Sequence, residues 1–336
     1  MGGYAMKRSH RIFAALILAV LVFLTGCTGG GAREERTFFG FDTVCSVSFY
    51  KGGNQSILTR CEELLQEHEW IFDRFDEDGL IFAINNFAEP VMIDYAVADC
   101  IRIAKEYNEL SGGLFDITLA PIMDMYGFGS DEPSVPDEEM LKVLLSTMTG
   151  MDKLQVDESD MLIKPFGVQM DLGAIAKGYT ADRMRELLED SKVRSAIINL
   201  GGNVVVMGDK DGEPFSVGIQ YPFEADGTSI AAVLVSDASV VTSGIYQRYF
   251  EKDGKIYHHI IDPTTGRPAD TDLYSATIIT DSAAKADAMS TVCMLLGAEK
   301  AMELIENTAG FEAVFVTNEN EVIYTSGLEG KVTVTK

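Results

Sequence analysis

The sequence of 336 residues predicts an α+β fold in which mixed, largely antiparallel sheets are flanked by helices. Apolar residues recur at helical spacing in several stretches, whereas other stretches are rich in β-formers and separated by short turns. The two kinds of stretch follow one another without a regular βαβ rhythm, which favours α+β over α/β. The sequence contains neither GxGxxG nor GxxxxGK[ST], so neither a Rossmann fold nor a P-loop domain is predicted.

The elements are predicted from local patterns, in chain order. Residues 37–50 alternate between apolar and polar, which indicates a strand or a pair of strands. Residues 56–75 carry apolar side chains at helical spacing, and a second helix is predicted from an Asp94 N-cap to the glycine pair at 112–113. The remaining predictions are a polar, proline-bearing loop over 129–138 before a short helix, a hairpin over 196–207 that turns at GGN, strands near 215–220, 230–235, 239–242, 256–261 and 274–280, helices over 282–296 and 298–308, and a terminal hairpin around 318–320.

The N-terminal segment predicts export and a lipid anchor. Three basic residues precede an apolar run over 12–24, which suits a signal peptide but is short for a membrane-spanning helix of the mature protein. The run ends in LTGC, which resembles a bacterial lipobox, so Cys27 is expected to carry the lipid (palmitate) once residues 1–26 are removed. A plain secretory peptide that happens to place a cysteine here is the alternative. Residues 27–36 then form the lipidated cysteine and a flexible tether, and residues 37–336 form the folded domain on the extracytoplasmic face of the cell membrane.

The formal net charge of −25 limits the partners. An acidic surface repels nucleic acid and anionic lipid headgroups, so no nucleic-acid partner is expected, and acyl chains rather than basic residues must provide the membrane anchor. The same surface repels anionic nucleotides, so a phosphate-bearing ligand needs a local cation or a metal ion. Four cysteines are scattered through the domain and form no CxxC pair, which disfavours a zinc site: Cys45, Cys61, Cys100 and Cys293. An exported protein can form a disulfide, but cysteines this widely spaced are more often buried small apolar residues.

The run DLGAIAKG, which starts at Asp171, is the first candidate for ligand binding. It is predicted to follow a strand over 168–170 and to open a helix, with Asp171 as the N-cap at a helix terminus that favours anions. Gly173 and Gly178 would let a ligand or a neighbouring backbone come close, and Lys177 adds a positive charge. An ordinary capped helix with glycines chosen for packing is the alternative.

A second candidate is the pair Asp287 and Thr291, which lie four residues apart on one face of a predicted helix. A carboxylate and a hydroxyl are hard oxygen ligands and suit Mg²⁺, which keeps phosphate and water oxygens for its other positions. An exposed polar stripe is the alternative. A transition-metal site is disfavoured because only His68, His258 and His259 remain after the signal peptide.

Two histidines supply a third candidate. His258 and His259 precede the turn sequence DPTTG, and histidine titrates near neutrality, so either could act as a general base. A packed or surface histidine is the commoner fate of this residue type. The runs GGLFDITLAP and VTSG, which start at Gly112 and Val241, have the composition of ligand-lining loops and are weaker signals.

Six ordered blocks, GGLFDITLAP, DLGAIAKGYTAD, INLGGN, VTSGIYQRYF, HIIDPTTGRP and ADAMSTVCMLLG, resemble the ApbE family of FAD:protein FMN transferases. The resemblance runs from about Phe38 to the C-terminus and implies one ApbE-like, T-fold-related catalytic domain. His259 matches the family's histidine and becomes the candidate base, whereas His258 has no counterpart. The roles implied at the other matching positions are FAD contacts for Leu114, Phe115, Asp116, Asp171, Lys177 and Ile260, and Mg²⁺ ligands for the backbone carbonyl of Ala174 and the side chains of Asp287 and Thr291.

Two positions depart from the family pattern. Phe41-Asp42-Thr43 stands where many members have Met-Gly-Thr, and Phe75 stands where others carry a tyrosine near the end of the first helix. Both positions are expected near the flavin. Stacking on Phe41 and Phe75 could therefore persist while a hydroxyl contact is lost.

The resemblance implies Mg²⁺-dependent transfer of FMN from FAD, the substrate, to a threonine of an acceptor protein, with AMP released and with His259 and Asp287 in catalytic roles. Either His259 or a nearby carboxylate takes the proton of the threonine hydroxyl. The resemblance also implies that the acceptor is a respiratory or redox protein. An FAD pyrophosphatase that hydrolyses FAD to FMN and AMP, or a non-catalytic FAD-binding lipoprotein, are the alternatives. A generic solute-binding lipoprotein is disfavoured because two βαβ-rich lobes are not predicted.

Overall fold

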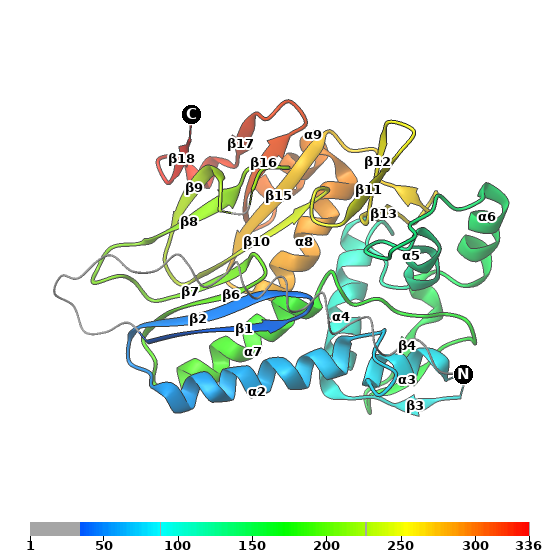
Figure 1. Ribbon diagram of the computed structural model, residues 1–336, viewed down its shortest axis with the longest axis horizontal. Helices are drawn as coiled ribbons and strands as arrows, with labels where there is room; N and C mark the ends of the chain where they lie inside the picture. The colour runs from blue at the N-terminus through cyan, green and yellow to red at the C-terminus, as the bar shows by residue number, and fades with distance from the viewer. Residues whose placement is uncertain (1–33, 88, 226, 336) are drawn as a thin grey trace. The chain divides into compact units, whose positions relative to one another are not determined.

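The computed structural model describes residues 34–87, 89–225 and 227–335 (Figure 1). The predicted signal peptide, Cys27 and most of the predicted tether lie outside these residues. Within the described part of the chain, no helix combines the length and the apolar character needed to cross a membrane.

An eight-stranded sheet, antiparallel at every pairing, is the central element of the described chain (Figure 1). Two of its connections are two-residue hairpin turns, because Gly40 pairs with Thr43 and Leu200 pairs with Asn203. In spatial order the strands are β1 (Glu34–Gly40), β2 (Thr43–Lys51), β6 (Ser195–Leu200), β7 (Asn203–Met207), β10 (Ala238–Gly244), β15 (Leu273–Thr280), β16 (Glu312–Thr317) and β17 (Val322–Tyr324).

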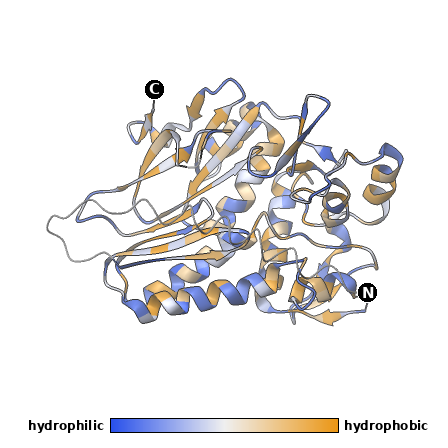
Figure 2. Cartoon of the chain, viewed as in Figure 1, coloured by the Kyte–Doolittle hydropathy of each residue, from blue (hydrophilic) through white to orange (hydrophobic). Residues whose placement is uncertain are grey.

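Helices pack against the sheet and enclose the main hydrophobic core. Three of the helices, which begin at residues 55, 95 and 283, are capped by the side chains of Asn54, Asp94 and Ser282. Each cap accepts hydrogen bonds from backbone amides that have no partner within the helix. Polar and apolar residues alternate around α2 in Figure 2, whereas α8 is buried on most sides because β10, β15, α7 and α4 all contact it. The helices are α2 (Gln55–Phe72), α4 (Tyr95–Leu110), α7 (Ala176–Asp190), α8 (Ala283–Leu296) and α9 (Ala298–Glu306).

A three-stranded sheet meets further residues of the central sheet in a second hydrophobic core. Its strands are β8 (Phe215–Gln220), β9 (Ser229–Val235) and β18 (Val332–Val334), in the order β18-β9-β8. The alternating burial along β8 shows one face toward this core and one toward solvent, as expected for an antiparallel sheet covered on one side.

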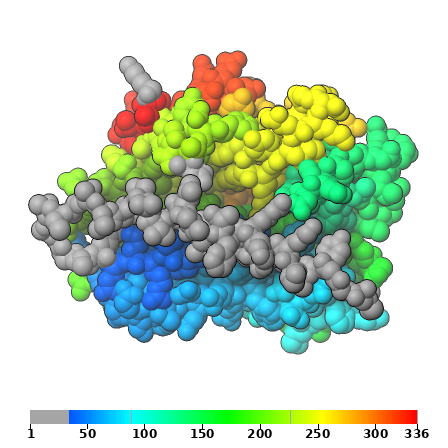
Figure 3. Space-filling view, viewed as in Figure 1, coloured from blue at the N-terminus to red at the C-terminus, as the bar shows by residue number. Residues whose placement is uncertain are grey.

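Shorter elements complete the described chain. A third apolar cluster joins α5 (Ala120–Tyr126) and α6 (Glu138–Thr147) to the hairpin of β11 (Tyr249–Lys252) and β12 (Lys255–His258), and these segments adjoin at the surface in Figure 3. The others are α3 (Leu80–Asn86), β3 (Val91–Met92), the 3-10 turn η1 (Met151–Lys153), β4 (Gln155–Val156), β5 (Met161–Ile163), β13 (Ile261–Asp262), β14 (Arg267–Pro268) and η2 (Ser326–Leu328).

The structure confirms the α+β class, the first strand pair, the Asp94 cap and the hairpin at Gly201. Cys45, Cys61, Cys100 and Cys293 are free and buried, as their scattered spacing indicates. The short helix α3 and the small sheet of β3, β5 and β4 were not predicted, because elements this short show no periodicity.

The predictions of one strand and of one helix end are wrong. Residues 168–170 form no strand, because the side chain of Asn85 takes both backbone groups of Met170 that a neighbouring strand would otherwise bind. Helix α2 ends at Phe72 rather than near residue 75. The carboxylate of Asp73 accepts the amide of Phe75 at 2.8 Å, and this local turn competes with continuation of the helix.

Candidate functional site

A cavity of about 440 Å³ lies among the β1–β2 turn, the end of α2, the start of α7 and one face of α8. This volume falls within the range of small-molecule sites. The structure brings all the predicted FAD, metal and base residues to its lining, although they come from distant parts of the chain. They are Phe41, Phe75, Leu114, Phe115, Asp116, Asp171, Ala174, Lys177, His259, Ile260, Asp287 and Thr291.

Close contact between α7 and α8 builds one wall of the cavity. The amide of Gly178 on α7 donates to Oδ2 of Asp287 on α8 at 3.0 Å. A Cβ at Gly178 would lie 2.3 Å from the backbone oxygen of Ala283, so only glycine lets the helices approach this closely. The predicted close approach at Gly178 is therefore to a neighbouring backbone. The carboxylate of Asp287 is held by this hydrogen bond, and the residue is only 3% exposed.

A second carboxylate ties the same two helices together. Asp182 on α7 accepts hydrogen bonds from Ser282 Oγ at 2.7 Å and from the amides of Ala283 and Ala284 at 2.7 and 3.0 Å. These amides begin α8 and have no partner within the helix. Burial raises the pKa of Asp182, and the three donated bonds oppose that rise. The wall is therefore held at Asp287 itself and at the start of α8.

The wall presents hard oxygen atoms to the cavity. Thr291 lies one helical turn after Asp287, and its Oγ1 is 3.4 Å from Oγ of Ser243 on β10. Ala174 lines the cavity from the turn before α7. Among the described residues, no group of three or more His, Cys, Asp or Glu is placed to hold a metal ion. One carboxylate, one hydroxyl and one backbone carbonyl make a different donor set, and its chemistry fits Mg²⁺.

Asp171 is not the N-cap of α7, which corrects the sequence prediction. The helix begins at Ala176, and Asp171 lies five residues earlier in a turn. Its Oδ1 accepts the amide of Gly173 at 2.9 Å, and its Oδ2 accepts Nε of Arg74 at 2.9 Å. Lys177 lies in the first turn of α7, where its Nζ donates to the carbonyl of Gly173 at 3.2 Å.

The loop after α4 contributes a buried ring and a carboxylate. Phe115 is 2% exposed and contacts Tyr107, so much of its ring belongs to the core. Asp116 accepts both the amide and the hydroxyl of Thr118, at 2.7 and 2.6 Å. Burial raises the pKa of Asp116, and the bonds from Thr118 oppose that rise. Leu114 is partly exposed beside them.

Two aromatic side chains also line the cavity, one at the β1–β2 turn and one just after α2. Phe41 and Asp42 form the β1–β2 turn with φ of 53° and 58°, a left-handed conformation that glycine or asparagine usually supplies. The amide of Phe41 donates to Oε1 of Glu69 at 2.9 Å, which helps to hold this turn. Phe75 is 66% exposed and has the guanidinium of Arg74 4.1 Å from its ring centre.

His259 and His258 have different environments. His259 lines the cavity, and its Nδ1 lies 3.2 Å from the carbonyl oxygen of Arg248. A carbonyl can only accept, so Nδ1 carries the proton and Nε2 is left as the acceptor. Burial and the nearby Arg248 lower the pKa of His259 to about 3, so its imidazole is neutral near pH 7. His258 is 5% exposed and does not line the cavity, and the neighbouring Ile260 is also buried.

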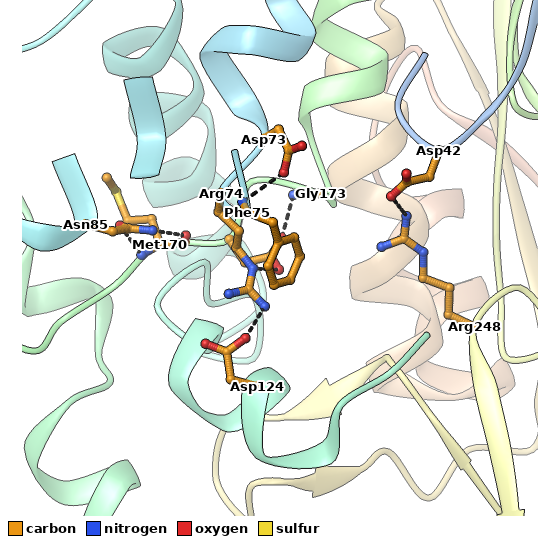
Figure 4. Close-up of polar contacts among 10 residues, drawn as sticks. Asp42, Asp73, Arg74, Phe75, Asn85, Asp124, Met170, Gly173 and Arg248 are labelled. Atoms are coloured by element: carbon orange, nitrogen blue, oxygen red, sulfur yellow. Dashed lines mark hydrogen bonds and ion pairs between the residues drawn. The ribbon is translucent and has the colours of Figure 1, made fainter. Parts of the chain in front are cut away.

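Several cavity residues were not singled out from the sequence. Glu69 and Arg74 lie at the end of α2 and just after it, in an acidic stretch without a recognisable motif. Gln247 and Arg248 fall inside the block VTSGIYQRYF, so position within that block was the available signal. Arg248 reaches across the rim to Asp42, 3.8 Å away (Figure 4).

A family model described as the ApbE family matches residues 41–315, which is most of the chain. The chain belongs to the ApbE family. Relatives named FAD:protein FMN transferase align with this chain over more than nine-tenths of its length. The relative from Treponema pallidum is 34% identical over 98% of both chains, and that from Escherichia coli K12 is 30% identical over 91% of this chain and 92% of its own.

Solved structures agree with this membership. The ApbE protein of Thermotoga maritima superposes with a TM-score of 0.81 at 29% identity, covering 89% of this chain and 99% of its own. The flavinyl transferase ApbE of Pseudomonas stutzeri, in its apo form, gives 0.79 at 27% identity and covers 89% and 96%. The ApbE-like architecture predicted from the sequence is therefore confirmed.

Proposed function

We propose that this member of the ApbE family transfers FMN from FAD to a threonine hydroxyl of an acceptor protein and releases AMP. The observation that carries the proposal is the cavity itself. It gathers fixed hard oxygens on α8, the cation of Lys177 and a neutral imidazole, His259, in a chain whose relatives are named FAD:protein FMN transferase. The names of these relatives support flavin transfer to a protein; the threonine and a respiratory or redox acceptor are the finer parts of the proposal.

Mg²⁺ would be held by Asp287, Thr291 and the backbone carbonyl of Ala174. When bound, it would neutralise phosphate charge and stabilise the charge that develops on the leaving oxygens. Support comes from the chemistry of this donor set and from the bond that Gly178 donates to Asp287, which orients the carboxylate before any ligand arrives. Lys177 supplies further positive charge to a diphosphate that the acidic protein would otherwise repel.

The acceptor hydroxyl attacks the FMN phosphorus, a new P–O bond forms, and the bond from that phosphorus to the oxygen of AMP breaks. Nε2 of His259 takes the hydroxyl proton because Nδ1 is committed to the carbonyl of Arg248. The anionic diphosphate would raise the low pKa of His259 and so make the imidazole a better proton acceptor when FAD is bound. Phe41 and Phe75 offer ring surfaces for the flavin nucleotide.

Incubation with FAD, Mg²⁺ and candidate acceptors tests the proposal. Mass spectrometry of the acceptor should show an added FMN on a threonine, with one AMP released per FMN added. Free FMN and AMP with no labelled protein would instead indicate an FAD pyrophosphatase. Bound, intact FAD without AMP would indicate a non-catalytic FAD-binding lipoprotein.

We also propose that the protein is anchored by lipid on Cys27 at the extracytoplasmic face of the cell membrane. The LTGC sequence after a basic and apolar leader supports this location. Metabolic labelling with palmitate should mark the native chain but not the Cys27→Ser variant. Equal recovery of both proteins in the soluble fraction would contradict the anchor.

A further inference from the structure

Arg74 is a nearly buried cation on the cavity wall. Its side chain is 10% exposed. Its Nε donates to Oδ2 of Asp171 at 2.9 Å. Its Nη2 donates to Oδ1 of Asp124 at 2.7 Å (Figure 4). The guanidinium also lies over the ring of Phe75. One side chain thus connects the segment after α2, the turn before α7 and helix α5.

The charges around Arg74 argue against a direct role in phosphate binding. Two carboxylates face one guanidinium, so the group of Arg74, Asp124 and Asp171 carries net negative charge. Lys177 differs, because the partner described for its Nζ is the neutral carbonyl of Gly173. A cation that is already paired on two sides serves better to hold a carboxylate than to attract a diphosphate.

The carboxylate that Arg74 holds controls a turn. One carboxylate oxygen of Asp171 accepts a hydrogen bond from Arg74, and the other accepts one from the amide of Gly173. The backbone amide of Asp171 donates to the carbonyl of Ile117 at 2.8 Å. Ala174, which follows Gly173 in the chain, lines the cavity, and α7 begins at Ala176. The orientation of the Asp171 side chain therefore sets the path of the backbone that reaches Ala174.

Asn85 shows the contrasting way of holding the same segment. It donates to the carbonyl of Met170 at 2.9 Å and accepts its amide at 2.8 Å, in a position that is 6% exposed (Figure 4). This clamp binds only backbone and fixes where the segment starts. Arg74 binds a side chain that faces the cavity, so it can set how the turn is presented to a ligand.

We propose that Arg74 is a positioning residue, which acts through Asp171 to hold residues 171–174 so that the Ala174 carbonyl faces the metal ion and Asp171 faces FAD. The inference rests on the proposed function for the identity of those ligands. Loss of Arg74 leaves a carboxylate beside the cavity without its cation and frees the turn. Affinity for the metal and for FAD should therefore fall together.

A double-mutant cycle tests this coupling. Affinities are measured in the absence of turnover, for Mn²⁺ by its paramagnetic resonance signal and for FAD by flavin fluorescence, in the wild type, Arg74→Met, Asp171→Asn and the double variant. Methionine keeps an apolar stem against Phe75 and removes the charge. Arg74→Met should lower the affinities for Mn²⁺ and for FAD about tenfold each, the size expected for a lost charge-assisted hydrogen bond. In the Asp171→Asn background the same replacement should change either affinity less than about twofold.

Additive losses in the cycle would overturn the proposal, because Arg74 would then act on a ligand without Asp171. Unchanged affinities in Arg74→Met would overturn it too. Arg102→Met is the matched control, since Arg102 pairs with Asp160 away from the cavity lining and should leave both affinities unchanged. Should Arg74→Met fail to fold, Arg74→Lys takes its place. A lysine keeps the charge but lacks the planar guanidinium that donates to Asp171 and Asp124 together. Arg74→Lys should therefore lower both affinities by an intermediate amount, and this loss should also disappear in the Asp171→Asn background.

The cycle and the proposed function can fail separately. A wild-type protein that binds Mn²⁺ and FAD but labels no acceptor would contradict FMN transfer while the affinities still report on Arg74. Normal transfer by the wild type with an additive cycle would contradict only the role of Arg74.

Discussion

The two sides of the cavity are built on different principles. On the α7–α8 side, Asp287 is 3% exposed and fixed by an amide from the facing helix. On the rim, Asp42 and Arg248 have side chains that are 85% and 56% exposed and lie 3.8 Å apart. The first side is held by backbone contact and burial, and the second by solvated side chains that water and salt can replace.

The difference also bears on how freely each side can accept other side chains. Phe41, Asp42 and Phe75 lie at the β1–β2 turn and just after α2, whereas Gly178 and Asp287 lie where α7 and α8 meet. A helix contact that leaves no room for a Cβ restricts the sequence strongly. A partly exposed turn accepts several side chains at modest cost in stability.

The largest expected effect comes from Asp287 on the wall. Asp287→Ala should lower FMN transfer by roughly 10³-fold or more, because a fixed charged ligand to the metal is lost. Transfer is measured by AMP release and acceptor labelling across a Mg²⁺ titration. Normal activity of this variant at limiting Mg²⁺ would exclude the metal assignment.

His259 lies between wall and rim and should have the next largest effect. His259→Ala should slow the chemical step about 10²-fold, the usual contribution of a general base, while FAD affinity changes little. His258→Ala is the control, because His258 is buried outside the cavity lining and should alter stability rather than the rate of transfer. A variant at residue 259 that loses only FAD binding would show that the imidazole is not the base.

Gly178 tests the wall through stability. Gly178→Ala places a methyl group 2.3 Å from the oxygen of Ala283 and should destabilise the fold by about 1–3 kcal/mol, with a lower melting temperature and weaker metal binding. Gly173→Ala is the comparison, since its Cβ would meet only the side-chain oxygen of Asp171, at 3.0 Å. Equal melting temperatures of the two variants in a thermal unfolding assay would contradict a tightly restricted wall.

Acid should weaken the buried helix side through His68. Burial lowers the pKa of His68, which contacts Thr180 on α7, from 6.5 to about 4. Below about pH 6.5 the unfolded chain binds a proton that the folded chain does not, so this contribution to stability is lost as the pH falls toward 4. Denaturant unfolding at pH 7, 6 and 5 should show a smaller pH dependence for His68→Phe than for the wild type.

The smallest effect is expected at the rim. Asp42→Asn removes the ion pair with Arg248, and exposed pairs contribute about 0–1 kcal/mol that salt reduces further. The variant should keep the wild-type melting temperature and change the affinity for FAD less than about threefold. A large loss in 0.5 M salt would show that the rim is more rigid than its exposure indicates.

Local patterns were enough to predict most of the fold, and the resemblance to a family named twelve of the residues that line the cavity. Alternation marked the β1–β2 pair, and the Asp94 cap marked the start of α4. The family blocks named Asp287 and His259, and the structure places both on one cavity. The roles of these residues stay predictions until they are tested.

Other features could not be predicted because their causes lie far away in the sequence. Asn85 removes a predicted strand by binding Met170, and no local pattern reports that contact. The Asx turn at Asp73 ends α2 three residues early, so Phe75 lies beyond the helix on an exposed rim. Arg74 carries no motif, and its hydrogen bond to Asp171 appears only in the folded chain.

The sequence by itself determined the class of fold, the family and the residue types available for chemistry, because periodicity, caps and motifs are local properties of the chain. The tertiary structure decided what those residues do. It showed that position 178 needs a glycine because a backbone oxygen of Ala283 leaves no room for a Cβ. It also showed that Asp171 accepts hydrogen bonds from Arg74 and Gly173 instead of capping a helix. These contacts join residues about a hundred positions apart, and only the packing of the folded chain brings them within hydrogen-bonding distance.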